Sequence, residues 1–163
     1  MPESKKIRVL FVCLGNICRS PLAEVVVKSV AKQRGLEHYH FESAGTGDWH
    51  IGKSADHRSA SKAIDHGLDL SQHRAQQITA HKIKNWHWLV AMDQANYQDL
   101  LSMGADASKV LLMRQFENPT NTPDVPDPYY GGAAGFEDAY QMLVANAEGL
   151  LDFLESHTDM IDL

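Results

Sequence analysis

Short apolar runs alternate along the chain with longer stretches in which apolar residues recur at helical spacing. Most of the runs are brief and rich in β-branched residues, which is typical of strands that are buried on both faces. Strands are therefore predicted at residues 7–12, 40–44, 88–92 and 110–113.

The stretches between these runs carry residues that start or stop helices. Apolar residues recur at helical spacing after Pro21, and Gly35 supplies a C-terminal stop for this first helix. Further helices are predicted at residues 56–66 before Gly67, at 79–83 with Thr79 as cap, at 94–103 between Asp93 and Gly104, and over the strongly periodic segment 136–154.

This alternation predicts an α/β domain with a parallel sheet and right-handed crossovers. The chain shows no internal repeat, low-complexity segment or composition change, so a single domain is expected over residues 1–163. Residues 114–135 form the longest irregular stretch and contain Pro119, Pro123, Pro126 and Pro128. A loop of this length inside a compact domain is usually functional or disordered.

Composition and charge exclude several classes of protein and of binding partner. The formal net charge of −6 argues against nonspecific binding to nucleic acid or membranes. No apolar stretch reaches the roughly 20 residues that a membrane helix needs, and the N-terminal residues lack the apolar core of a signal peptide. The two cysteines lie in one loop, so no disulfide framework is expected. A cytoplasmic, reduced protein is predicted.

The loop after the first predicted strand carries the most specific chemistry in the chain. Cys13 directly follows that strand, and Arg19 and Ser20 lie where the first helix begins. Backbone N–H groups of such a loop can form an anion site, and an arginine adds a fork that matches two phosphate oxygens. Surroundings that bind a dianion also stabilise a cysteine thiolate. The spacing therefore favours Cys13 as a nucleophile toward a phosphomonoester.

The sequence resembles the low-molecular-weight protein tyrosine phosphatases over nearly its whole length. The segments that carry the resemblance are Cys13 to Pro21, Ser43-Ala44-Gly45-Thr46, Trp49-His50-x-Gly52, His73-Arg74-Ala75, Ala91-Met92-Asp93 and Asp127-Pro128-Tyr129-Tyr130. The resemblance implies a three-layer, flavodoxin-like α/β/α fold with a four-stranded parallel sheet in the order 2-1-3-4. It also implies hydrolysis of phosphotyrosine in proteins, with inorganic phosphate as product and neither metal nor cofactor. A monomer is expected.

Residues of the motifs take the following roles under this resemblance. Cys13 is the expected nucleophile, Arg19 the phosphate clamp, and Asp127 the general acid and then base. Ser20 would hydrogen-bond the thiolate, and it could also cap the helix. Asn16 tolerates left-handed backbone angles, and the family implies that its side chain holds the loop in shape with His73 nearby. The phosphate-binding loop is expected to comprise Leu14, Gly15, Asn16, Ile17, Cys18 and Ser20.

Aromatic residues on loops are expected to form the walls of a deep slot. Trp49, Tyr129 and Tyr130 would stack on the phenyl ring of the substrate. A slot of this depth lets phosphotyrosine reach the cysteine where phosphoserine falls short. Cys18 is expected to be a packed loop residue, with a possible second role as the partner of an oxidised Cys13 in a reversible disulfide.

Single residues distinguish this function from four others. An arsenate reductase needs further cysteines downstream, and none follows Cys18. Phosphoarginine phosphatases resemble this family closely but carry threonine in place of Ile17. A phosphocysteine carrier must avoid hydrolysing its own intermediate, which Arg19 and Asp127 would promote. A redox protein would leave Arg19 unexplained, and the cysteines do not form a Cys-x-x-Cys motif. The phosphoarginine phosphatase and the carrier are kept as alternatives.

Overall fold

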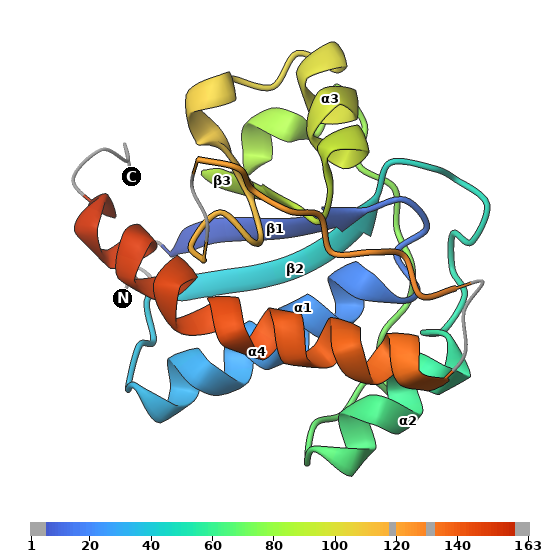
Figure 1. Ribbon diagram of the computed structural model, residues 1–163. Coiled ribbons are helices and arrows are strands. Elements are labelled where there is room, and N and C mark those ends of the chain that lie inside the picture. Colours follow the sequence, from blue (N-terminus) through green and yellow to red (C-terminus); the bar gives the residue numbers. More distant parts are fainter. Residues whose placement is uncertain (1–5, 118–119, 130–132, 159–163) are drawn as a thin grey trace, which may run out of the picture.

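The computed structural model describes residues 6–117, 120–129 and 133–158. Its centre is a four-stranded parallel sheet in the order β2-β1-β3-β4 (Figure 1). The strands are β1 (Ile7–Cys13), β2 (Tyr39–Gly45), β3 (Trp88–Ala91) and β4 (Val110–Leu112). The α/β class, the parallel sheet and the order 2-1-3-4 are confirmed.

Helices cover both faces of the sheet. The helices are α1 (Arg19–Gln33), α2 (His57–Asp65), α3 (Gln94–Ser102) and α4 (Ala133–Ser156), with short 3₁₀ turns at Ile83–Asn85 and Ala107–Lys109. Figure 1 shows α1, α2 and α4 together on one side and α3 on the other. Alternate residues of β1 point to opposite faces of the sheet. Val9 and Phe11 pack into the core with α1 and α4, whereas Leu10 and Val12 pack toward α3.

The predicted helix ends agree with the observed ones at the strongest signals. Asp56 and Asp93 cap α2 and α3 by accepting hydrogen bonds from backbone N–H groups of the first turn. Gly35, Gly67 and Gly104 follow α1, α2 and α3 with φ of 72°, 77° and 102°, a region in which glycine is favoured.

The predicted helix over residues 79–83 is wrong. The N–H of Lys82 bonds the carbonyl of Thr79, and the N–H of Trp86 bonds that of Ile83. Bonds of this spacing form a turn and then the 3₁₀ turn Ile83–Asn85. β3 begins at Trp88, so too few residues remain for an α-helix. None of the described helices combines the length and apolar character needed to cross a membrane.

The carboxyl ends of the strands bring distant segments together. β1 leads into loop 14–18 and then α1, and β2 leads into the loop of Trp49. The segment after β4 returns across this edge, because the N–H of Val125 bonds the carbonyl of Met92 just beyond β3. Ligands of open α/β sheets bind at such an edge.

Candidate active site

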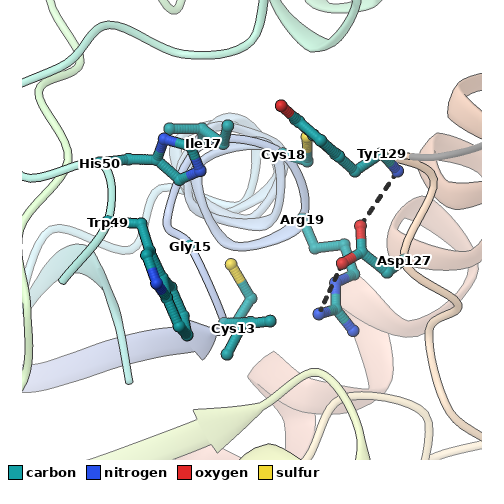
Figure 2. A pocket seen from close by; sticks show the side chains of 10 residues that line it. Cys13, Gly15, Ile17, Cys18, Arg19, Trp49, His50, Asp127 and Tyr129 are labelled. Carbon is teal, nitrogen blue, oxygen red and sulfur yellow. Dashed lines mark hydrogen bonds and ion pairs between the residues drawn. The ribbon is translucent and has the colours of Figure 1, made fainter. Parts of the chain in front are cut away.

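Loop 13–20 wraps around the sulfur of Cys13. The N–H of Asn16 donates to Cys13 Sγ at 3.2 Å, and the hydroxyl of Ser20 lies 2.9 Å from the same sulfur. The thiol side chain points into a pocket, with Arg19 beside it (Figure 2). The sulfur therefore lies within hydrogen-bond distance of one backbone N–H donor and one hydroxyl.

Ser20 lies beside the Cys13 sulfur but does not cap α1. α1 starts at Arg19, and the residue at its N-cap is Cys18, which makes no side-chain capping bond. The expected capping role of Ser20 is therefore wrong. Its hydroxyl instead bonds Cys13 and receives a bond from the side chain of Asn16.

Asn16 holds the loop in shape from within. It is fully buried and has φ of 58°, the left-handed region in which asparagine is tolerated. Its Nδ2 donates to Ser20 Oγ at 2.8 Å and to Ser43 Oγ at 3.0 Å, and its Oδ1 accepts the N–H of Gln76 at 2.9 Å. The ring Nε2 of His73 lies 2.7 Å from its carbonyl oxygen.

Gly15 provides space in the loop and is not a residue with positive φ. Asn16 is the residue of this loop with positive φ, whereas Gly15 is not among the positive-φ glycines. A Cβ on Gly15 would lie 2.9 Å from Cδ2 of His50. A larger residue at this position would therefore displace the histidine ring.

Arg19 is a buried cation beside the thiol. Its side chain is 3% exposed, and Nη1 donates to Asp93 Oδ2 at 2.6 Å and to the carbonyl of Val125 at 3.0 Å. Burial lowers the pKa of Arg19, but the negative groups of Cys13, Asp93 and Asp127 outweigh it, so the pKa is raised. The guanidinium therefore keeps its charge at the floor of the pocket.

Asp127 lies across the pocket from Trp49 (Figure 2). Its Oδ2 is 3.6 Å from Nη2 of Arg19, and its Oδ1 accepts the N–H of Tyr129 at 3.0 Å. Asp124, three positions earlier in the chain, instead accepts the N–H of Gln94 at the start of α3. The geometry therefore places Asp127, and not Asp124, at the pocket formed by loop 13–20.

The pocket that these residues enclose has a volume of about 350 Å³. It is lined by Cys13, Leu14, Gly15, Ile17, Cys18, Arg19, Trp49, His50, Asp127 and Tyr129. Trp49 is 64% exposed and Tyr129 36% exposed, so both aromatic side chains stand at the rim rather than in the core. Tyr130, the third predicted wall residue, lies outside the described residues.

Two contacts of the site were not predicted from the sequence. Asp93 was expected only as a helix cap, but one carboxylate oxygen caps α3 while the other holds Arg19. Arg58 of α2 forks onto Asp56 and donates to the carbonyl of Tyr129 at 2.9 Å. Its guanidinium also lies 5.5 Å from the centre of the Tyr129 ring. The Asp-x-Arg spacing at the start of α2 is the only sequence signal for this link.

Cys18 is a second thiol that lines the pocket. Both thiols are free and buried. Burial raises the pKa of Cys18, and the negative groups of Asp56, Cys13 and Asp127 raise it further, so this thiol stays protonated. In the described part of the chain, His, Cys, Asp and Glu side chains form no group of three or more that could hold a metal ion.

Comparisons with known proteins agree with this site. The family model of the low molecular weight phosphotyrosine protein phosphatases matches residues 8–159. A low molecular weight protein-tyrosine-phosphatase of Streptomyces coelicolor is 42% identical over 150 residues, covering 88% of this chain and 91% of its own. A protein tyrosine phosphatase structure from Entamoeba histolytica is 37% identical with a TM-score of 0.87, covering 94% of this chain and 99% of its own. The Drosophila arginine phosphatase structure is 29% identical with a TM-score of 0.83, covering 90% and 97%.

Proposed function

The chain belongs to the low molecular weight phosphotyrosine protein phosphatases, and we propose that it hydrolyses phosphotyrosine in proteins through a phosphocysteine intermediate at Cys13. It is a hydrolase, and the product we assign to it is inorganic phosphate. The observation that carries the mechanism is the cluster of Cys13, Arg19 and Asp127 around one pocket.

The first step transfers the phosphoryl group to the enzyme. The Cys13 thiolate attacks phosphorus, so an S–P bond forms while the P–O bond to the tyrosyl oxygen breaks. Asp127, in its protonated form, gives its proton to that leaving oxygen. Arg19 is anchored through Nη1 by Asp93 and Val125. Its other edge, Nε and Nη2, is the one we assign to the equatorial phosphate oxygens.

The second step frees the enzyme. The Asp127 carboxylate takes a proton from a water molecule, whose oxygen attacks phosphorus while the S–P bond breaks. The Cys13 sulfur leaves as a thiolate, stabilised by the Ser20 hydroxyl at 2.9 Å and the Asn16 N–H at 3.2 Å. Inorganic phosphate is released, and Asp127 is again protonated.

The walls of the pocket support an aryl substrate. Trp49 and Tyr129 stand at its rim on opposite sides, which suits stacking on a phenyl ring (Figure 2). Cys13 is buried at the floor, so a short phosphoserine side chain would leave its phosphorus above the sulfur. We further propose that the protein acts in the cytoplasm, as a monomer, on phosphoprotein substrates.

A phosphoarginine phosphatase is the second candidate, because an arginine phosphatase from Drosophila shares the fold. Ile17 lines the pocket here with a buried, apolar side chain. An apolar side chain offers no hydrogen bond to a guanidinium, so phosphotyrosine is favoured.

Turnover of three matched peptides tests the proposal. The peptides carry phosphotyrosine, phosphoserine or phosphoarginine at one position, and EDTA is present throughout. We expect fast phosphate release from phosphotyrosine alone and none with Cys13→Ser. Preference for phosphoarginine would keep the cysteine mechanism but overturn the substrate assignment. A stable phosphoenzyme without release would indicate a carrier.

A further inference from the structure

A second hollow lies beside the candidate active site, on the far side of Leu14 and Trp49. Its volume is about 350 Å³. It is lined by Leu14, Thr46, Gly47, Trp49, Asp99, Ser102 and Met103, and we call it the α3 groove. Leu14 and Trp49 line both hollows, so these two side chains form the ridge between them.

The ridge has a fixed position relative to the phosphate loop. The N–H of Thr46 bonds the carbonyl of Cys13 at 2.9 Å, and the N–H of Gly47 bonds that of Leu14 at 2.9 Å. A Cβ on Gly47 would come within 2.0 Å of the Trp49 ring, so the indole lies directly on this backbone. A peptide segment that runs from the first pocket into this second hollow therefore crosses the ridge at a defined place.

The lining of the α3 groove combines apolar walls with one carboxylate. Leu14, Trp49 and Met103 supply apolar surface, and Asp99 supplies the negative charge. No lysine, arginine or histidine lines the groove. Among the described residues, the carboxylate of Asp99 has no ion-pair partner. Asp99 is exposed, so a ligand can reach it.

We propose that the α3 groove binds a lysine or arginine side chain that flanks the phosphotyrosine of the substrate. A long basic side chain fits both features, because its methylene stem packs on apolar walls while its charged head stays in water near a carboxylate. This inference rests on the proposed function, since it assigns a subsite to a phosphotyrosine peptide. It makes Asp99 a specificity residue and leaves the chemistry at Cys13 unchanged.

Paired phosphopeptides test the subsite. Each pair carries lysine or glutamate at one position, from two residues before to two residues after the phosphotyrosine. Every kcat/KM is divided by that of the same enzyme on para-nitrophenyl phosphate, which is too small to reach the groove. At one of these positions we expect lysine to be preferred over glutamate by roughly twofold to fivefold, the range of an exposed ion pair. The preference should shrink in high salt.

Variants that change the charge of residue 99 test whether the Asp99 carboxylate causes the lysine preference. Asp99→Asn should remove the lysine preference at that position, and Asp99→Lys should turn it into a glutamate preference. Asp99 lies near the C-terminal end of α3, where a negative charge opposes the helix dipole, so both variants should fold. Glu37→Lys is the matched control, because it makes the same change of charge in the exposed turn before β2, at the opposite end of the sheet.

The outcomes separate this inference from the proposed function. Equal turnover of lysine and glutamate peptides at every position would overturn the subsite, and so would a preference that Asp99→Lys leaves unchanged. A reversal produced equally by Glu37→Lys would indicate net charge alone and would also overturn it. Failure to hydrolyse any phosphotyrosine peptide would instead overturn the function proposed above.

Discussion

Replacing Asn16 tests whether one buried side chain holds the phosphate loop in shape. Asn16→Gly removes three side-chain hydrogen bonds, to Ser20, Ser43 and the N–H of Gln76. At about 1 kcal/mol for each bond, the free energy of unfolding should fall by roughly 3 kcal/mol. Ser43 keeps its bond to Glu24, which limits the loss at that partner.

Asn16→Ala removes the same bonds and adds a backbone penalty. The residue has φ of 58°, and this left-handed conformation destabilises an alanine by roughly 1–2 kcal/mol. Alanine also reduces the conformational entropy of the unfolded chain relative to glycine, which stabilises the folded state by about 0.4–1 kcal/mol. The alanine variant should therefore be less stable than the glycine variant by roughly 0.5–1 kcal/mol, the reverse of their order at an ordinary helix or strand position.

Urea unfolding at 25 °C measures both differences. Ser43→Ala is the control, because it removes one of the three bonds together with the Ser43–Glu24 bond and should cost about 2 kcal/mol. The reasoning is refuted if the alanine variant is at least as stable as the glycine variant. It is also refuted if both variants lose less than about 1 kcal/mol.

Four further results are expected. Asp127→Ala should slow phosphotyrosine hydrolysis by roughly 10²–10⁴-fold and slow para-nitrophenyl phosphate hydrolysis less, since that leaving group needs little help from an acid; equal losses would contradict the general-acid role. Arg19→Lys should lower kcat by roughly 10²–10³-fold, because an ammonium cannot reproduce the fork, and near-normal turnover would exclude the clamp. Arg58→Ala should lower kcat/KM on phosphotyrosine peptides by roughly threefold to tenfold through loss of its bond to Tyr129; Arg58→Lys should not restore it, and unchanged activity would show that the bond does not position the loop. Burial lowers the pKa of His73 below 6.5, so the unfolded chain binds a proton first as pH falls. Stability should therefore decline as pH drops from about 7 to about 5.5, and His73→Gln should flatten this decline in urea unfolding; equal declines in both proteins would contradict this origin.

Local signals made the fold and the centre of the site predictable. The apolar runs, the caps at Asp56 and Asp93 and the glycines after the helices depend on near neighbours in the chain, so the sequence alone reveals them. The Cys13-to-Ser20 spacing also acts locally, since strand, loop and helix follow one another directly.

The pattern of apolar and polar residues does not predict contacts between distant segments of the chain. Arg19 meets Asp93 across 74 positions, and Arg58 meets Tyr129 across 71. No periodicity encodes such pairs, because they depend on how the strands are ordered and where the long loop returns. The role of Gly15 was missed for the same reason: its neighbour His50 comes from another loop. The α3 groove likewise combines the first loop, the second loop and α3.

Trapping the phosphoenzyme tests the central claim most directly. Asp127→Ala slows the attack of water on the intermediate, so phosphate should accumulate on the enzyme during turnover of para-nitrophenyl phosphate. The reaction is quenched with alkaline denaturant, because the S–P bond hydrolyses in mild acid, and the peptides are mapped by mass spectrometry without acidification, with Cys13→Ser in the same background as control. The mechanism predicts one phosphoryl group on the peptide of Cys13 and none in the control. Phosphate on any other residue, or rapid turnover without a phosphoenzyme, would contradict it.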